Sequence, residues 1–356
     1  MNKLDKYIIV NYIKSFFLGM MMFFSIFLLA ESLNLTGWIM DGKFKLHDAF
    51  KYLGYGIPEI MTNTAPLGVL LGSLLCISKM AKQLEIAAMK TSGISFSRIA
   101  LFPMIFSFLI SMLVLWINYD TLGKWNAKKE SLKERKVENK DPVRAEKDFV
   151  LVKIDKDTIL YSGHASKKEG TLQYVEILKV SKDFKKIEKL YTASSGKIDF
   201  KRWTFKDLKE RNLKTNVSVP TDTKTFNFVA SMDDVLASPV AAKNLTMPEL
   251  REKIVYFTRV GADSLNLRID FYYRISFALS SFVMCLIGLS LGSRYVRGGA
   301  AVNIGLSVII GYSYYGVSTI LKSVATSGAI PIYLACFLPL IVFFAIGVKL
   351  FKDSEY

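Results

Sequence analysis

The chain has 356 residues, of which 51% are apolar, and a formal net charge of +16. That charge is compatible with a nucleic-acid-binding protein or with a membrane protein that has basic loops, and its position along the chain decides between them. The three cysteines, Cys76, Cys285 and Cys336, all lie in apolar runs and form no CxxC pair. This excludes a disulfide framework and a cysteine-based zinc site.

Six uncharged, mostly apolar runs stand out. A helix rises about 1.5 Å per residue, so ~20 residues cross a ~30 Å hydrocarbon layer. Five runs reach 19 to 26 residues, and the first extends to Ile8–Ala30 if Lys14 reaches the interface. The N-terminal stretch has no small-residue cleavage site, so we expect a retained helix. We predict six transmembrane helices, over Ser15–Ala30, Ile60–Ser78, Ile99–Tyr119, Ile275–Ser293, Gly298–Leu321 and Ser323–Val348.

The orientation follows from the lysines and arginines of the short loops and ends. One side carries eleven of them, in the two termini, in Lys79–Arg98 and in the SRYVRGG loop with Arg294 and Arg297. The other side carries four, namely Lys43, Lys45, Lys51 and Lys322. We therefore expect both termini in the cytoplasm and the long insert outside. A basic domain outside the cytoplasm argues against nucleic acid as a partner.

The insert between the third and fourth runs has the pattern of a small all-β sandwich, two packed sheets. It begins with a charged, helix-like stretch, WNAKKESLKERKVENK, and continues with short alternating runs separated by Gly, Asp, Lys and Ser. It carries 31 Lys+Arg against 22 Asp+Glu. The predicted fold class is thus a membrane α+β protein with 3+3 helices. The predicted divisions are residues 1–119, the β domain with its flanking connectors over 120–268, and residues 269–356.

Known catalytic motifs are absent from the sequence. It contains no G-x-x-x-x-G-K-[ST], no H-E-x-x-H and no G-x-S-x-G, and its only histidines are His47 and His164. We therefore expect no nucleotide site, no metal site, no cofactor and no enzymatic activity of its own. If ATP drives this protein, a partner must bind it.

A short polar segment between the second and third spans, KQLEIAAMKTSGIS (residues 82–95), is too polar to span a bilayer. Its periodicity predicts a helix that Gly93 ends. In the cytoplasm such a helix can dock into a groove of a partner, and a solvated connector is the alternative reading.

Polar groups near the span ends have two readings each. Asp270 and Arg274 lie one turn apart, which allows an intrahelical pair, and Arg274 either anchors its helix at the interface or faces a polar cavity. Lys43, Lys45 and Lys51 form a basic patch that is either solvated loop charge or a contact for headgroup phosphates.

Several stretches resemble the permease subunits of the lipopolysaccharide export ABC transporter, the LptF/LptG type. They are LDKYI (Leu4–Ile8), PLGVLLGSLL (Pro66–Leu75), LEIAAMKTSGIS (Leu84–Ser95), IDFKRWTFKD (Ile198–Asp207) and GAIPIYLACFLPLIVFF (Gly328–Phe344). The order of three helices, an outer β domain and three helices is also similar. The most specific part is E-x-x-x-M-x-x-x-G-I-S, from Glu85 to Ser95.

The resemblance implies a bacterial inner-membrane permease that extracts lipopolysaccharide and passes it to a periplasmic bridge of jellyroll domains. It implies as partners a cytoplasmic ABC ATPase dimer, a sister six-helix permease and a single-span periplasmic jellyroll subunit. By the same resemblance, the polar segment 82–95 is the coupling helix, and the residues that contact the ATPase are Leu84, Glu85, Ala88, Met89 and Gly93. The outer domain becomes a β-jellyroll.

One feature departs from the family pattern. Family members often place lysines in the outer half of the first helix, whereas this chain has SIFLLAESLNL with Glu31. Lipid-headgroup contacts are therefore expected at Lys43, Lys45, Lys51 and Arg274, or the substrate differs in charge. The alternative function is a mechanotransmission subunit that relays ATP hydrolysis to a periplasmic partner without moving lipid.

Overall fold

The computed structural model describes residues 3–138, 146–167, 169–181, 187–199, 202–213, 217–228, 230, 232, 235, 241–294 and 299–355. The chain forms two compact units. The helical unit comprises Met1–Asn139, Ala242–Pro248 and Arg268–Tyr356, and the β unit comprises Lys140–Ala241 and Glu249–Leu267. The helical unit therefore includes the first part of the predicted insert and a short return segment, which the predicted division at residues 120 and 268 assigned to the outer domain.

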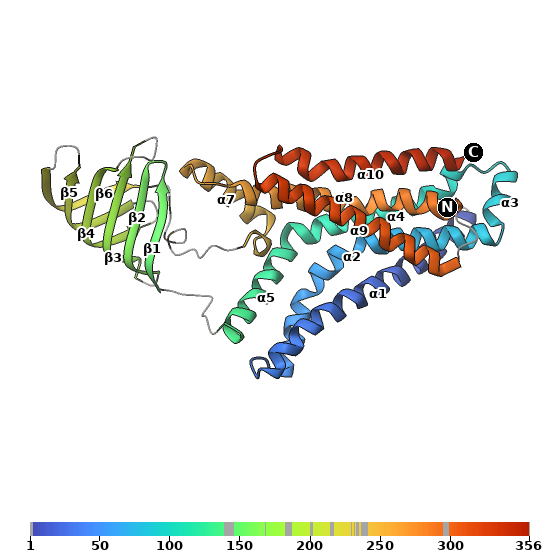
Figure 1. The fold of residues 1–356 in the computed structure, drawn as a ribbon, viewed down its shortest axis with the longest axis horizontal. Coiled ribbons are helices and arrows are strands. Elements are labelled where there is room, and N and C mark those ends of the chain that lie inside the picture. Colours follow the sequence, from blue (N-terminus) through green and yellow to red (C-terminus); the bar gives the residue numbers. More distant parts are fainter. Residues whose placement is uncertain are drawn as a thin grey trace. The chain divides into compact units, whose positions relative to one another are not determined.

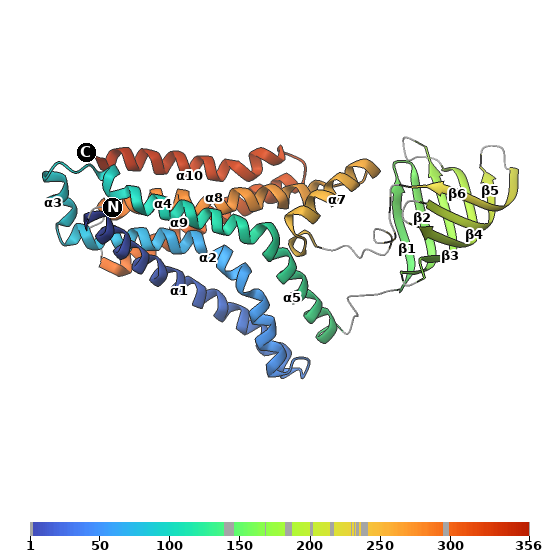
Figure 2. The same cartoon turned by 180° about the vertical axis from the view of Figure 1, so that it is seen from behind.

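Six helices are long and apolar enough to cross a membrane, within the part of the chain that the structure describes, as predicted. They are α1 (Lys3–Met40), α2 (Leu46–Lys82), α4 (Phe96–Trp116), α8 (Leu265–Arg294), α9 (Gly299–Thr326) and α10 (Ile332–Glu355). Helix α4 continues through a π-helical turn (Ile117–Thr121) into the polar helix α5 (Leu122–Lys136), which Figure 2 shows from behind. The predicted start of the fifth span, Gly298, and the loop residue Arg297 lie outside the described residues. The predicted start of the sixth span, Ser323, is wrong: α9 continues to Thr326, the chain turns at Gly328 with a φ of 76°, and α10 begins at Ile332.

Glycines explain why α2 packs so closely against its neighbours. A Cβ on Gly72 would lie 2.6 Å from the Cα of Phe16, and one on Gly68 would lie 3.0 Å from the Cα of Met20. These residues let the backbones of α1 and α2 touch, as small residues do in membrane helix pairs. Gly288 has the same role between α8 and α2, since a Cβ there would lie 2.8 Å from the Leu70 carbonyl oxygen.

The helices differ strongly in how far they are covered. In the most apolar stretch of α2, 83% of the residues are buried, and in that of α8 78%. The corresponding shares are 17% in α1 and 22% in each of α9 and α10. Helices α2 and α8 therefore form the centre of the unit, while α1, α9 and α10 expose large apolar faces that a lipid or another protein has to cover. Figure 1 shows α1 lying along α2.

The β unit contains an antiparallel sheet of six described strands in chain order, a meander. The strands are β1 (Glu146–Asp155), β2 (Thr158–Ser166), β3 (Thr171–Val180), β4 (Ile187–Asp199), β5 (Arg202–Asn212) and β6 (Val217–Asn227). The prediction of an inserted β domain is confirmed. Its described strands form one layer, whereas the sequence pattern had suggested two packed sheets.

The core of the β unit lies on one face of this sheet. Trp203 and Phe205 on β5 are fully buried there, and the Trp203 indole N–H donates to the Ala230 carbonyl oxygen at 3.2 Å. Helix α7 (Met247–Val260) contributes Tyr256 to the same core. The stretch Ile198–Asp207, which resembles the outer domain's tryptophan-bearing hairpin, falls on the paired strands β4 and β5, and its residues 200 and 201 lie outside the described residues.

Candidate functional site

Helix α3 (Glu85–Thr91) occupies the end of the helical unit where both chain termini lie, as Figure 1 and Figure 2 show. Leu84 precedes it with a left-handed φ of 60°, and Gly93 follows it with a φ of 83°, a conformation that glycine adopts at little cost. Both ends are therefore sharp turns, and α3 is a separate short helix between the second and third spans, within the predicted segment 82–95.

The inner side of α3 packs against the helical core. Ile86 and Met89 are buried in a cluster that α1, α2, α4 and α8 complete. Leu84, Ala88 and Gly93 are exposed, with Leu84 70% exposed. Of the predicted ATPase-contacting residues, Met89 thus holds α3 in place from inside and is not part of the outer surface. An exposed apolar side chain and two exposed small residues on one short segment suit docking into a protein groove.

Glu85 is half-buried and bound within the chain. One carboxylate oxygen accepts a hydrogen bond of 2.8 Å from the Tyr7 hydroxyl of α1. The other oxygen, Oε2, is buried and has no hydrogen-bond partner among the described residues. Glu85 therefore connects α3 to α1 through its first oxygen.

Three contacts that the sequence did not predict fix α3 and the start of α4 to other helices. The Lys90 ammonium donates to the carbonyl oxygens of Ser354 and Glu355 at 2.7 and 3.1 Å, which lack partners within α10 because they end it. The Glu355 carboxylate accepts from the backbone N–H and the hydroxyl of Ser97 at 3.1 and 3.0 Å. Arg98 pairs with Asp5 of α1 at 3.0 Å. The sequence shows only that these side chains are charged or polar, which does not identify the residues they bind.

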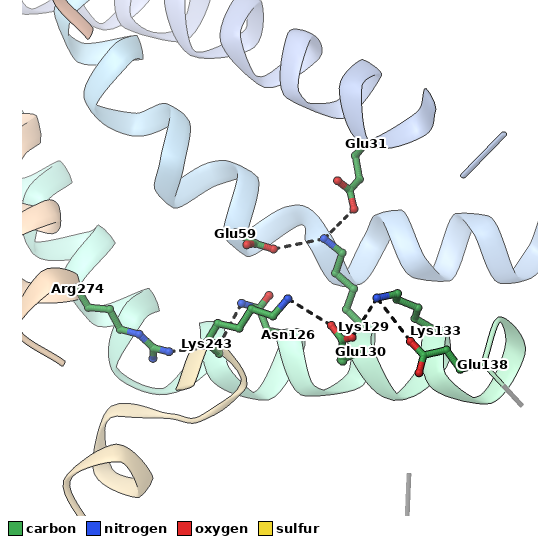
Figure 3. A network of polar contacts seen from close by, with 9 residues as sticks. All are labelled: Glu31, Glu59, Asn126, Lys129, Glu130, Lys133, Glu138, Lys243 and Arg274. Carbon is green, nitrogen blue, oxygen red and sulfur yellow. Dashed lines mark hydrogen bonds and ion pairs between the residues drawn. The ribbon is translucent and has the colours of Figure 1, made fainter. Parts of the chain in front are cut away.

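A second polar cluster lies at the opposite end of α1 and α2 (Figure 3). Lys129 of α5 bridges two carboxylates, with its Nζ 2.9 Å from Glu31 Oε1 on α1 and 3.3 Å from Glu59 Oε2 on α2. The same ammonium lies 5.1 Å from the ring centroid of Tyr52. Glu31 is therefore an ion-pair partner of an internal lysine. Lys129 lies 98 positions from Glu31 and 70 from Glu59, which is why sequence reasoning missed this bridge.

Arg274 faces neither Asp270 nor open space. Its side chain is 7% exposed and donates to the carbonyl oxygens of Leu245, Ala242 and Lys243 at 2.8, 2.9 and 3.2 Å. Asp270 forms an ion pair with Lys322 of α9 instead. Arg274 thus holds the return segment against α8, and these guanidinium hydrogen bonds go to backbone carbonyl oxygens.

The three lysines proposed for headgroup contact are exposed. Lys43, Lys45 and Lys51 lie at or near the turn between α1 and α2, and Lys43 pairs with Asp41 at 3.3 Å. A cleft lies around Lys129 between α1, α2 and α5, and none of these three lysines lines it. They remain an exposed basic patch, and a headgroup contact at them stays a prediction.

The described residues contain no group of three or more His, Cys, Asp and Glu side chains arranged to hold a metal ion. Comparison with curated proteins finds no match. Comparison with protein-family models finds one, the lipopolysaccharide export system permease LptF/LptG, over residues 6–353. The match spans both helical halves and the β unit between them. The chain therefore belongs to the LptF/LptG family of lipopolysaccharide export permeases, multi-pass proteins of the bacterial inner membrane and subunits of an ABC transporter.

Proposed function

We propose that this permease is driven by a cytoplasmic ATPase dimer that docks on the exposed side of α3. The observation that carries the proposal is the two-sided build of this helix. Its inner side chains, Ile86 and Met89, pack into the helical core, while Leu84 and Ala88 remain exposed for a partner. Glu85 is half-buried beside them, and a basic side chain of the ATPase would pair with its carboxylate through a charge-assisted hydrogen bond.

The orientation that this requires puts α3 and both termini in the cytoplasm and the β unit in the periplasm. The excess of lysine and arginine on the α3 side supports it. A second six-helix permease would cover the exposed faces of α1 and α9, and lipopolysaccharide acyl chains would lie in the apolar space between them. Collapse of that space would move the lipid toward the β unit and on to a bridge of periplasmic jellyroll domains, with a single-span jellyroll subunit as a further partner.

The first test asks which proteins assemble with this chain. Affinity purification of the tagged chain from native membranes is expected to recover an ATPase and a second six-helix protein, and recovery of neither would refute the assembly. Photo-crosslinking from exposed positions such as Phe17 on α1 and Ile309 on α9, 57% and 65% exposed, is expected to give lipopolysaccharide adducts. The mechanical relay would instead give no lipid adducts from either helix.

The second test concerns coupling. Glu85→Lys is expected to abolish lipopolysaccharide release while leaving ATP hydrolysis and membrane insertion, because it places a cation where a partner cation should bind. Tyr7→Phe is the matched control, since it removes only the internal hydrogen bond of Glu85. Normal export by the Glu85→Lys variant, or an equal loss in the Tyr7→Phe variant, would contradict the docking role.

A further inference from the structure

Helices α1, α2 and α5 and the short 3-10 turn Ala242–Asn244 enclose a cleft, here called the α5 cleft. Its volume is about 390 Å³, within the ~300–1,000 Å³ of small-molecule sites. It lies wholly within the helical unit and around the Lys129 bridge described above. None of the contacts used for the proposed function involves it.

Every lysine that lines the α5 cleft already has a carboxylate partner. Lys129 is shared by Glu31 and Glu59. Lys133 and Lys243 both pair with Glu130, at 3.3 Å each, and Lys133 also approaches Glu138 at 3.9 Å. Figure 3 shows these pairs side by side along α5. Around Lys129 two carboxylates therefore face a single cation, whereas Lys133 and Lys243 share Glu130, with Glu138 as a longer contact.

The groups that lack partners in the α5 cleft are acceptors. Asn126 is 5% exposed, and its Nδ2 donates to the Lys243 carbonyl oxygen at 3.3 Å, which turns Oδ1 away from that segment. In Figure 3 this oxygen points to the side where Glu59 and Lys129 lie. Oδ1 of Asn126 and Oδ1 of Asn244 have no donor among the described residues. Native proteins rarely leave buried polar atoms unpaired, so both oxygens call for a donor from outside the chain.

The remaining walls suit a ring. Trp38 lines the α5 cleft beside Tyr52, with the two ring centroids 5.6 Å apart and the planes at 89°. In small-molecule sites, aromatic side chains contact the apolar face of a ring while a few polar groups bind its polar edge. Trp38 and Tyr52 can therefore contact the face of a ring-shaped ligand, and the nearby carboxylates and carboxamides can bind its edge.

We propose that the α5 cleft binds an ammonium-bearing, hydroxyl-rich headgroup of the amino-sugar type and discriminates against phosphate. The ammonium would sit near Glu31 and Glu59, and hydroxyl or ammonium donors would satisfy Asn126 and Asn244. The inference rests on the proposed function and deepens it, because it names the part of a glycolipid headgroup that this chain would recognise.

The test is a titration of the full-length protein in nanodiscs of phosphatidylglycerol. Glucosamine is the probe, N-acetylglucosamine removes the positive charge while keeping the ring, and glucose 6-phosphate supplies the anion. Glucosamine is expected to bind about tenfold more tightly than either. Equal binding of all three sugars, or strongest binding of the phosphate, would overturn the proposal.

Substitutions test whether glucosamine binds in the α5 cleft or elsewhere on the protein surface. Asn126→Leu keeps the size of the side chain without its acceptor, and Glu31→Gln removes one charge at a less buried site. Each is expected to weaken glucosamine binding about fivefold, as the loss of one hydrogen bond predicts. If Asn126→Leu does not fold, Glu31→Gln decides alone. Glu134→Gln, on α5 but outside the cleft lining, is the control. Unchanged binding in the Glu31→Gln variant would contradict the assignment.

Two sources could supply the same ammonium chemistry, a lipid headgroup or a soluble sugar. Repeating the titration in phosphatidylethanolamine nanodiscs distinguishes them, because an amine-bearing lipid that enters the cleft competes with glucosamine. Competition assigns the site to membrane lipids, and its absence assigns it to a sugar outside the bilayer. Recovery of the ATPase in the affinity purification does not depend on the α5 cleft, so failure of the inference and failure of the proposed function can be told apart.

Discussion

Replacement of Arg274 by alanine tests whether this residue has a structural or a lipid-binding role. The change leaves the carbonyl oxygens of Leu245, Ala242 and Lys243 without their donor in a site where Arg274 itself is only 7% exposed. A hydrogen bond to a charged group contributes about 1.5–3 kcal/mol, and three bonds to one side chain add less than fully. We therefore expect a loss of about 3–5 kcal/mol in the stability of the contact between α8 and the return segment.

The assay has two readouts. Thermal unfolding in detergent is expected to show a lower midpoint, and hydrogen–deuterium exchange is expected to lose protection selectively over residues 242–248. Arg274→Lys should fall between the variant and the wild type, because an ammonium is a point donor and cannot span the carbonyls as the planar guanidinium does. Arg251→Ala, at an exposed position on α7, is the control. Unchanged exchange together with weaker lipopolysaccharide binding would refute the structural role and restore the headgroup reading.

Three further substitutions give independent checks. Gly72→Ala is expected to destabilise the protein by about 1–3 kcal/mol in detergent unfolding, because its Cβ would lie 2.6 Å from the Phe16 Cα. Gly305→Ala is the control and should be neutral or stabilising, because a Cβ there meets nothing within 4 Å. Equal effects of the two substitutions would contradict the close contact between α1 and α2. Lys90→Met should broaden the spin-label distance between α3 and the end of α10, and an unchanged distribution would show that the lysine is dispensable. Hydrogen bonds from Lys189 and Lys224 lower the pKa of Glu210 to about 2, so the stability it contributes is present above pH 4.5 and is lost as the pH falls toward 2. After allowance for solvent screening the loss is about 1–2 kcal/mol, and Glu210→Gln should flatten the acid dependence of β-unit exchange.

The spans could be predicted from sequence because length and hydropathy depend on the residues alone. Four predicted runs, Ser15–Ala30, Ile60–Ser78, Ile99–Tyr119 and Ile275–Ser293, lie within continuous helical segments, and α1 extends beyond its run to Lys3 and Met40, since charged residues near a helix end do not stop the helix. The sixth run, Ser323–Val348, was placed too early, because uncharged residues continue through the turn between α9 and α10 and hydropathy alone does not mark that turn. The division of the chain was harder to foresee. The polar helix α5 continues α4 without a break, and Ala242–Pro248 rejoins the helical unit, although both have the composition of the outer domain.

Side-chain partners were mostly beyond sequence reasoning. In a helix as short as α3, periodicity cannot decide which of two partly apolar sides faces inward, and Met89 proved to be buried. Spacing along the helix allowed an ion pair between Asp270 and Arg274. In the structure Asp270 forms an ion pair with Lys322, and Arg274 donates hydrogen bonds to backbone carbonyl oxygens. Spacing within one helix allows a local pair to form, and contacts with other elements decide whether it does.

The contacts of α3 also indicate which helices would follow its movement. It is hydrogen-bonded through Glu85 to Tyr7 of α1 and through Lys90 to the end of α10. These two helices are sparsely buried, with 17% and 22% of their most apolar stretches covered, whereas α2 and α8 are 83% and 78% covered. A force on α3 therefore meets less packing resistance along α1 and α10 than in the α2–α8 centre. We expect ATP to change the spin-label distance from α1 to α2 while the α2–α8 distance stays constant, and a change confined to α2–α8 would exclude this route of coupling.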